Sequence, residues 1–358
     1  VMPPGHVATE VFGEALEEAR DLIIEEDGVN KVPEHLRNAA EGHLSNFNIS
    51  VGVTDDFMRA VKNDEEYELI NPRTGETHIA TEETKELYGW FGLGDEVEVG
   101  EPLSIPAKEV YRRITKGAWE NGEPGMIFLE RANKMHSFDV DEHPEHEILA
   151  TNPCGEQPLE EYEACNLGHI NLSTCVHKES PDWRAFESSG DLEEQVRDFL
   201  DEAVDWDILN RRIRTGTHFL ENVVTMSDFP VDEITEKVGS NRKIGLGIMG
   251  LAQMYIQLGT RYGSDVSNEI AKQIMEHINH LSKKESHNIA TGQREYAERG
   301  VFDNWHKSKY QNPTEYKEWF EKLTGLEAED WEDGFKIRNH NTTTIAPTGT
   351  TSMIGDTT

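Results

Sequence analysis

Apolar residues recur along the chain at two different spacings. A spacing of three to four residues is typical of a helix with one buried face. Short runs that are apolar throughout, or that alternate with polar residues, are typical of strands. Because the two kinds of element follow one another, the pattern predicts an α/β fold with parallel strands. The predicted helices cover residues 57–61, 107–118, 192–204, 251–258 and 267–290, and the predicted strands cover residues 47–53, 126–129, 244–249 (strand or tight turn) and 342–346.

The chain divides into a short polar segment and one long domain. Residues 1–44 carry apolar residues at helical spacing and form an N-terminal segment of helical character. Residues 45–358 contain no internal repeat and no low-complexity linker, so the pattern predicts one domain there. Within it, residues 133–147 are predicted to form a polar loop.

Composition and charge exclude several classes of protein. Apolar residues make up 36% of the 358 residues, which is enough for a sizeable core. The 69 acidic residues exceed the 34 basic ones and give a net charge of −35, so binding to nucleic acid or to an anionic membrane is not expected. The dispersed acidity predicts adaptation to high salt. Three cysteines do not make a disulfide scaffold and predict a reducing, cytoplasmic compartment.

The strongest chemical signal lies at residues 152–156. In an extended chain, alternate side chains point the same way, so Asn152, Cys154 and Glu156 would share one face. An amide, a thiol and a carboxylate are costly to bury together without a use. A second thiol, Cys165, follows eleven residues later. On spacing alone, two ordinary buried cysteines explain the pattern equally well.

These residues resemble a known family. Residues 152–159 (Asn-Pro-Cys-Gly-Glu-Gln-Pro-Leu), followed by Cys-Asn-Leu-Gly at 165–168 and Ile-Asn-Leu at 170–172, are similar to the active-site segment of ribonucleotide reductases. The form with Gly and Gln-Pro-Leu around the cysteine is most like the class II, adenosylcobalamin-dependent enzymes. Further motifs of the family follow in its order at residues 46–51, 122–125, 242–247 and 345–350.

The resemblance implies a fold and a radical mechanism. Residues 45–358 would form the central part of a ten-stranded α/β barrel with an active-site finger loop, whose walls keep water from the radical. A thiyl radical at Cys154 would abstract the ribose 3′ hydrogen, and Glu156 would take the 3′-hydroxyl proton. Asn152 would orient that carboxylate and the sugar. Cys165 would be one of two reducing thiols that end as a disulfide.

The resemblance also implies ligands and partners. The substrate would be a ribonucleoside di- or triphosphate, the reductant a thioredoxin-like protein and the radical source adenosylcobalamin, with no metal ligated by this chain. A homodimer is compatible with the resemblance. The turn after the predicted strand at 342–346 would hold the substrate's phosphates at a helix start. Its residues are Pro347, Thr348, Gly349, Thr350, Thr351 and Ser352.

Departures from the family pattern indicate a middle fragment. The family's other redox cysteine lies upstream and its re-reducing thiols lie near the far end, and neither has a counterpart here. The chain is therefore expected to need upstream and downstream parts of the same enzyme, and to be inactive alone. His169 stands where a serine is usual. Cys175 matches no family thiol and is predicted to be a small buried residue.

Other interpretations remain open from the sequence. A class I chain would receive its radical from a separate subunit. Cys154 with His169 or His177 would suit a thiol nucleophile and base for acyl transfer, and a non-catalytic fragment would only complete another chain. The Gly-x-Gly-x-x-Gly at residues 245–250 is predicted to serve close backbone packing and not dinucleotide binding. Residues 143–147, with two histidines, are predicted to be a solvated loop and not a metal site.

Overall fold

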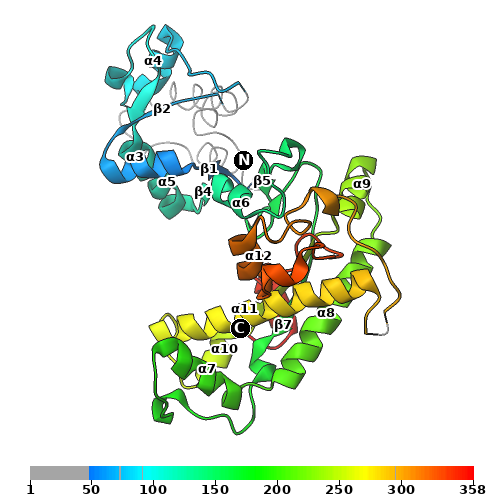
Figure 1. Ribbon diagram of the computed structural model, residues 1–358. Coiled ribbons are helices and arrows are strands. Elements are labelled where there is room, and N and C mark those ends of the chain that lie inside the picture. Colours follow the sequence, from blue (N-terminus) through cyan, green and yellow to red (C-terminus); the bar gives the residue numbers. More distant parts are fainter. Residues whose placement is uncertain (1–47, 72–73, 91, 295) are drawn as a thin grey trace. The chain divides into compact units, whose positions relative to one another are not determined.

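The computed structural model describes residues 48–71, 74–90, 92–294 and 296–358, which divide between two compact units (Figure 1). The first unit extends to Ala132 and includes Leu149–Gly155. The second unit comprises Asn133–Ile148 and Glu156–Thr358. The helical segment expected at residues 1–44 lies outside the described residues.

The first unit combines short strands with amphipathic helices. Strand β1 pairs in parallel with β4, with Val51 opposite Met126, and β2 pairs antiparallel with β3. The parallel pair confirms the predicted α/β character. The elements of this unit are β1 (Ser50–Gly52), α3 (Asp55–Asn63), β2 (Glu66–Glu68), α4 (Glu82–Trp90), η2 (Gly94–Glu96), β3 (Ser104–Pro106), α5 (Ala107–Asn121), β4 (Gly125–Ile127), the start of α6 (Leu129–Met135) and β5 (Ala150–Thr151).

Local chemistry sets the ends of the helices in the first unit. The Thr54 side chain accepts a hydrogen bond from the backbone N–H of Phe57 and caps helix α3, which includes the predicted helix at residues 57–61 and begins two residues before it. Helix α5 ends before Gly122, whose φ of +89° is accessible to glycine at little cost. The buried faces of both helices meet in one apolar cluster that includes Val51 and Ile114.

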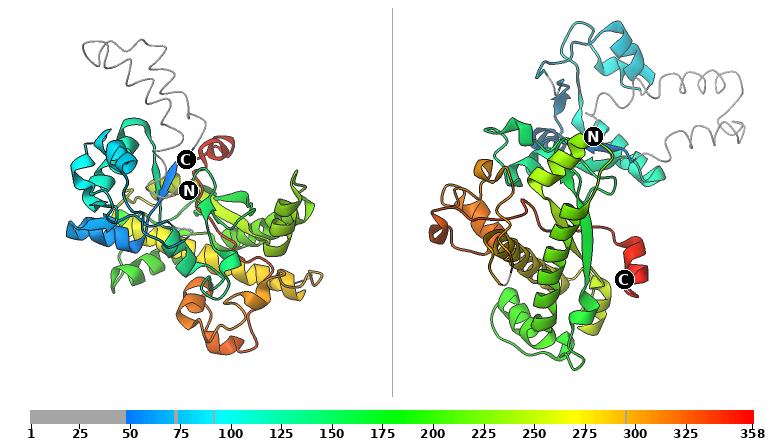
Figure 2. Two further views of the ribbon diagram at one scale, coloured as in Figure 1. Left: turned by 90° about the horizontal axis from the view of Figure 1, so that it is seen from above. Right: turned by 90° about the vertical axis from the view of Figure 1, so that its right-hand side faces the viewer.

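The second unit is larger and is organised around the parallel pair of β7 and β8. Helix α8 packs on one face of this pair, and α11 lies along α8 (Figure 2). Its elements are η3 (Pro144–His146), β6 (Pro158–Leu159), β7 (Asn166–Asn171), η4 (Leu172–Cys175), η5 (Trp183–Ala185), α7 (Leu192–Ala203), α8 (Trp206–Met226), α9 (Asp232–Asn241), β8 (Ile244–Met249), α10 (Leu251–Gln257), α11 (Asp265–Thr291), η6 (Trp305–Lys307), α12 (Lys317–Thr324), η7 (Ala328–Trp331) and α13 (Gly349–Ile354).

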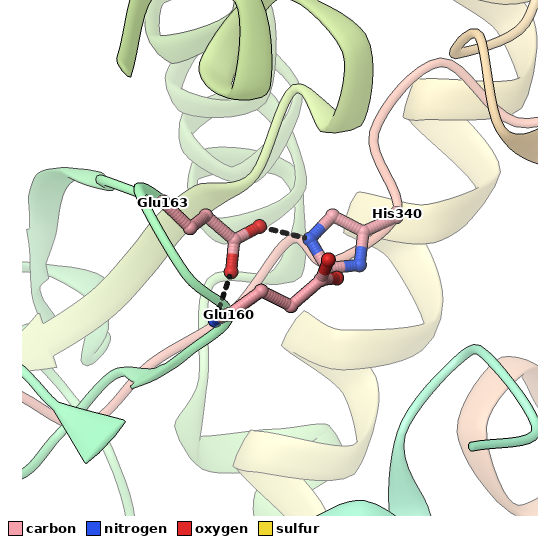
Figure 3. Close-up of side chains that lie close together, drawn as sticks. All are labelled: Glu160, Glu163 and His340. Carbon is pink, nitrogen blue, oxygen red and sulfur yellow. Dashed lines mark hydrogen bonds and ion pairs between the residues drawn. The ribbon is translucent and has the colours of Figure 1, made fainter. Parts of the chain in front are cut away.

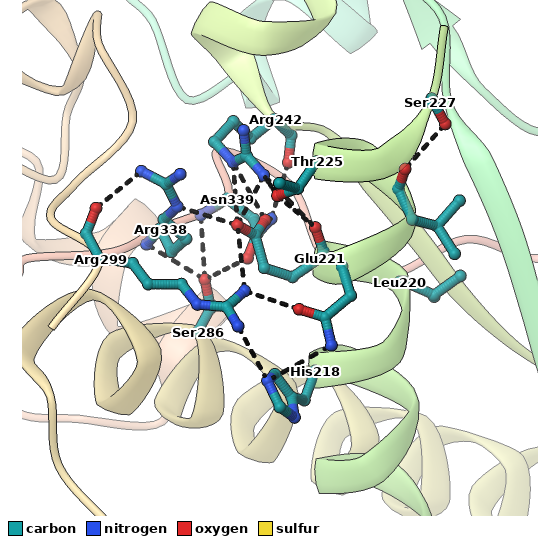
Figure 4. A network of polar contacts seen from close by, with 12 residues as sticks. His218, Leu220, Glu221, Thr225, Ser227, Arg242, Ser286, Arg299, Arg338 and Asn339 are labelled. Carbon is teal, nitrogen blue, oxygen red and sulfur yellow. Dashed lines mark hydrogen bonds and ion pairs between the residues drawn. The ribbon is translucent and has the colours of Figure 1, made fainter. Parts of the chain in front are cut away.

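A buried carboxylate ties α8 to two other segments (Figure 4). Glu221 of α8 lies 2.7 Å from Arg242 Nη2 and 2.9 Å from Arg338 Nε through its Oε1 atom. Its Oε2 atom accepts a hydrogen bond of 2.7 Å from Asn339 Nδ2. We call these four residues the Glu221 network. It fixes the start of β8 and residues 338–339 against the same helix.

Three details differ from the sequence predictions. Residues 342–346 are predicted to be a strand, but only Thr343 forms a bridge, parallel to Leu246 of β8. The predicted loop at 133–147 contains the end of α6 and the short helix η3. The described pairs β1–β4, β2–β3 and β7–β8 are two-stranded and do not form a closed barrel.

Across the described ranges, no helix combines the length and apolarity needed to cross a membrane.

Candidate active site

The segment that carries Cys154 is a turn, and the prediction of an extended chain there is wrong. The backbone N–H of Gly155 donates a 3.0 Å hydrogen bond to the carbonyl of Asn152, which closes a four-residue turn. Proline at the second position and glycine at the fourth are the residues that such turns favour. Alternate side chains of residues 152–156 therefore do not share one face through strand geometry. The signal for this turn was present in the sequence as Asn-Pro-Cys-Gly.

The four predicted catalytic residues are divided between the units. Asn152 and Cys154 belong to the first unit, and Glu156 and Cys165 belong to the second. Cys154 is exposed. Its neighbours in the turn, proline and glycine, are exposed too and offer little side chain to cover the sulfur.

The two faces of the β7–β8 pair have different roles. On the face toward α8, Gly168 lies against Leu220, and Ile170 is buried in the core. The Asn166 side chain donates a 2.8 Å hydrogen bond to the Leu220 carbonyl on the same face. Leu167 and His169 alternate with these residues and point to the opposite face. That opposite face is the one on which the candidate residues of the second unit gather.

Glycines of β8 make room on this opposite face. A Cβ added at Gly245 would lie 2.7 Å from Gln157 Nε2 and 2.9 Å from Leu167 Cδ2. A Cβ added at Gly247 would lie 2.9 Å from the carbonyl oxygen of Thr344. The prediction that these glycines allow close packing is confirmed. The Gly-x-Gly stretch lies inside a buried strand and not in a loop after one, so it does not have the form of a dinucleotide site.

Glu156 reaches the same face. Thr344 Oγ1 donates a 3.0 Å hydrogen bond to the Glu156 carbonyl, and the Thr344 backbone N–H donates a 3.1 Å bond to the carbonyl of Leu246 in β8. The Glu156 backbone is thus held beside β8. Its Oε2 atom is buried and has no hydrogen-bond partner within the described part of the chain. A buried, unbonded carboxylate oxygen is a suitable acceptor for a ligand's proton.

Cys165 lies one position before β7 and is half-buried. Its Sγ–H donates to the carbonyl of Asn166 at 3.0 Å. Burial raises the pKa of the Cys165 thiol to about 12; Lys243 opposes this shift, and Glu163 and Glu156 add to it. The thiol therefore stays protonated at neutral pH.

Cys175 is fully buried, which confirms the prediction that it is a small buried residue. Its Sγ atom accepts a 3.1 Å hydrogen bond from Arg212 Nη1.

A buried ionic cluster follows the turn, and the sequence analysis missed it (Figure 3). Glu163 lies 2.9 Å from His340 Nε2 and 2.6 Å from Lys243 Nζ. Glu160 lies 2.8 Å from His146 Nδ1. We call this group the Glu160–Glu163 cluster; its members are Glu160, Glu163, His136, His146, His340, Lys237 and Lys243.

The cluster corrects the prediction of a solvated loop at residues 143–147. His146 is buried, and its ring stacks on Phe138 with centroids 3.8 Å apart. The ring is also hydrogen-bonded to Glu160, which lies fourteen residues later in the chain. A local sequence pattern does not predict this contact. The neighbouring Glu145 and Glu147 are exposed, as predicted.

The ligand atoms of Glu160, Glu163 and His340 lie within 4.8 Å of one another, a spacing that a metal ion could use. However, Lys237 Nζ lies 2.5 Å from Glu160, and Lys243 contacts Glu163, so two ammonium groups already balance the two carboxylates. Burial alone would raise the pKa of Glu163, but the charges of Lys243 and His340 outweigh it and hold this pKa below its ordinary value. Both carboxylates of the cluster are therefore already paired with cations, whereas Nε2 of His146 has no hydrogen-bond partner among the described residues.

The predicted phosphate segment opens a short helix, as expected. Helix α13 begins at Gly349 after Thr348, which has a φ of +56°. The backbone N–H of Ser352 donates to the Thr348 carbonyl at 2.8 Å. Pro347, Thr350 and Thr351 are exposed. Binding of a phosphate here stays a prediction.

Known proteins resemble this chain over most of its length. Residues 19–358 match the family model described as ribonucleotide reductase, barrel domain. The chain is 35% identical over 336 residues to the vitamin B12-dependent ribonucleoside-diphosphate reductase of Thermoplasma acidophilum. These residues are 93% of this chain and 32% of that protein. It is 32% identical over 315 residues to the protein of that name from Mycobacterium tuberculosis (88% and 34%).

A relative with a different name matches less closely. The ribonucleoside-diphosphate reductase large chain 2 of Saccharomyces cerevisiae is 26% identical over 314 residues, which are 84% of this chain and 32% of that protein. The chain spans about a third of the length of these curated relatives.

Proposed function

The chain belongs to the ribonucleotide reductase family, and from this premise we propose that it provides the reaction segment of an enzyme that reduces ribonucleotides to 2′-deoxyribonucleotides. The observation that carries the proposal is the coincidence of the family match with the motif at residues 152–159. The buried, unbonded Oε2 atom of Glu156, on the same face of β7–β8 as His169, supports a reacting group at that position.

Each candidate residue has a separate role in the proposed reaction. Cys154, as a thiyl radical, removes the 3′ hydrogen of the ribose and later returns a hydrogen atom. Glu156 accepts the proton of the 3′-hydroxyl, which promotes loss of the 2′-hydroxyl as water. Asn152 orients the sugar. Cys165 and a second thiol from outside this chain provide two electrons and two protons and end as a disulfide, so the reaction balances as ribonucleotide plus dithiol giving deoxyribonucleotide, disulfide and water.

The protonated state of Cys165 supports its role as a reductant. A thiol with a pKa of about 12 stays protonated at neutral pH and so keeps a hydrogen that it can transfer to the substrate radical. The same property makes Cys165 a poor nucleophile at neutral pH, because the thiolate is the reactive form. The acyl-transfer alternative concerns Cys154, and this property of Cys165 does not bear on it.

We propose adenosylcobalamin as the cofactor, because the relatives with the highest identities given above are named vitamin B12-dependent. When bound, it would generate the radical that Cys154 carries. No side chain within the described ranges can be assigned to hold it, and the roles above concern only this chain's own residues.

The remaining proposals concern what the chain binds and joins. The relatives are named diphosphate reductases, which favours a ribonucleoside diphosphate whose phosphates lie at residues 347–352. A thioredoxin-like protein would re-reduce the disulfide. Upstream and downstream parts of the same enzyme would complete a ten-stranded barrel and cover Cys154, which is exposed in the described chain.

An assembly assay tests the proposal. The chain, combined with the upstream and downstream parts of the enzyme, is expected to form deoxyribonucleotide from a ribonucleoside diphosphate with a dithiol and adenosylcobalamin. Glu156→Gln should lower the rate by roughly 10²- to 10⁴-fold, the usual contribution of a general base. Glu161→Gln, which changes an exposed neighbour, is the matched control. Equal rates for the two variants would reject the proposed role of Glu156.

The same assay separates the two classes of reductase. The match to the Saccharomyces cerevisiae large chain keeps a class I enzyme as the second candidate. Product formation that requires adenosylcobalamin supports class II. Product formation without it, in the presence of a radical-generating subunit, would support class I instead.

A further inference from the structure

Two buried polar atoms on the candidate face lack a partner among the residues described. One is Oε2 of Glu156, and the other is Nε2 of His169. Buried polar atoms are almost always hydrogen-bonded, and those that are not call for an explanation such as an absent ligand. Neither the family match nor the proposed roles above assign a function to His169.

The backbone places these two side chains beside one segment. His169 lies opposite Gly247 in the register of β7 and β8. The position of a Cβ on Gly247 would be 3.0 Å from Cδ2 of His169 and 2.9 Å from the carbonyl oxygen of Thr344. Thr344 in turn holds the Glu156 backbone through its hydroxyl. The His169 imidazole and the Glu156 backbone therefore lie beside the same residue, Thr344.

Electrostatics agree with this placement. Burial lowers the pKa of His169, and the negative charge of Glu156 acts in the opposite direction. The ring is therefore neutral at pH 7, with one nitrogen able to donate and the other to accept. By contrast, the Nε2 atom of His340 already has a hydrogen-bond partner, because it is bonded to Glu163. His169 and Glu156 are close enough to interact, yet each keeps a polar atom unused.

A hydroxyl group satisfies both atoms at once. It donates its proton to a carboxylate oxygen and accepts a hydrogen bond from an imidazole N–H. We propose that His169 is a second substrate-binding residue, and that its Nε2 and Glu156 Oε2 together hold the 3′-hydroxyl of the ribose. This inference rests on the proposed function, which makes Glu156 the base for that hydroxyl.

The first test needs no activity. The ring pKa of His169 is measured by NMR in the full chain and in the Glu156→Gln and Glu161→Gln variants. Loss of the Glu156 charge is expected to lower the His169 pKa, whereas Glu161→Gln should leave it unchanged. An unchanged His169 pKa in Glu156→Gln would overturn the inference, even if the reductase assay supports the proposed function.

The second test asks which hydroxyl is bound. In the assembled enzyme, His169→Leu is expected to weaken binding of a ribonucleoside diphosphate roughly threefold to tenfold, the usual effect of one hydrogen bond. Binding of the 3′-deoxy analogue should not change. His169→Gln, whose amide can still donate, should restore most of the affinity, and His177→Ala alters an exposed histidine as a control.

The outcomes separate the two proposals. Equal weakening for the ribonucleotide and its 3′-deoxy analogue would overturn the hydroxyl assignment. A His169 pKa that responds to Glu156→Gln, in an assembled enzyme that forms no deoxyribonucleotide, would reject the proposed function and with it the ribose as the ligand.

Discussion

The second unit contains two buried carboxylate networks that differ in the chemistry of their partners. Glu221 is held by Arg242 and Arg338, whose guanidinium groups stay charged at every accessible pH (Figure 4). In the Glu160–Glu163 cluster the partners are lysines and histidines, which can lose or gain a proton. Figure 3 shows the two carboxylates of this cluster with His340. The first network should therefore act as a fixed structural tie, and the second should respond to pH and tolerate the loss of one charge.

The largest effect is expected in the fixed network. Glu221→Gln removes the negative charge that balances the buried Arg242 and the half-buried Arg338, and neither guanidinium can become neutral to compensate. We expect a loss of about 3–5 kcal/mol in the free energy of unfolding, measured by urea titration. Glu161→Gln, at an exposed site, is the control and should change little. A loss below about 1 kcal/mol would show that this network is not the tie that its geometry suggests.

A smaller effect is expected in the titrating cluster. Glu163→Gln removes the carboxylate that contacts Lys243, but Lys243 Nζ also donates a 2.6 Å hydrogen bond to the carbonyl of Pro158, which the substitution leaves in place. We expect a loss of about 1–3 kcal/mol in the same urea titration. If Glu163→Gln destabilised the chain as much as Glu221→Gln, the contrast between the two networks would be wrong.

The pH dependence of stability should come from the second cluster. Burial lowers the pKa of His136 to about 4, with a hydrogen bond to Glu160 opposing the shift. Between pH 6.5 and 4 the unfolded chain therefore binds a proton at this residue that the folded chain does not. Stability should fall on acidification across this window, by about 1 kcal/mol per pH unit from this residue. His136→Asn should flatten the slope, whereas His177→Asn should not; equal slopes would refute this origin.

The smallest effect is expected for an exposed ion pair. Lys272 lies 3.3 Å from Glu193 on the surface of the second unit. Solvent and salt screen such pairs, so Lys272→Ala should leave the urea midpoint unchanged within error. A shift comparable to that of Glu163→Gln would mean that burial is not what distinguishes the networks.

Local sequence patterns predicted five of the described helices, α3, α5, α7, α10 and α11, but they did not predict α4, α8, α9 or α12. The helix predicted at residues 192–204 is α7, which begins at Leu192 after a reciprocal capping box between Asp191 and Glu194. The stripe of isoleucines from Ile270 to Ile278 lies in the buried face of α11. These features depend on residues within one or two turns of each other, which is the range over which a single sequence is informative.

Features built from distant residues were missed. Burial of His146 depends on Phe138 and Glu160, and the partner of Glu163 is His340, 177 positions away. Strand pairing at residues 342–346 was overestimated, because β-branched residues favour strands but do not ensure a partner along their whole length.

The candidate site was predicted in part. The motif identified Cys154, Glu156, Asn152 and Cys165, whose roles stay predictions. Its geometry was misjudged at the turn, where Pro153 and Gly155 favour a reversal over an extended chain. The proposed role of His169 depends on its buried Nε2 atom, which has no hydrogen-bond partner among the described residues. The sequence alone does not show this.

The central claim is that the sulfur of Cys154 carries the reaction, and the most direct measurement compares two cysteines in the assembled enzyme. Deoxyribonucleotide formation is followed for Cys154→Ser and for Cys175→Ser, which alters a buried thiol outside the proposed site. The account predicts no detectable product with Cys154→Ser and retained activity with Cys175→Ser. Product formation by Cys154→Ser at the rate of the unmodified chain would contradict it.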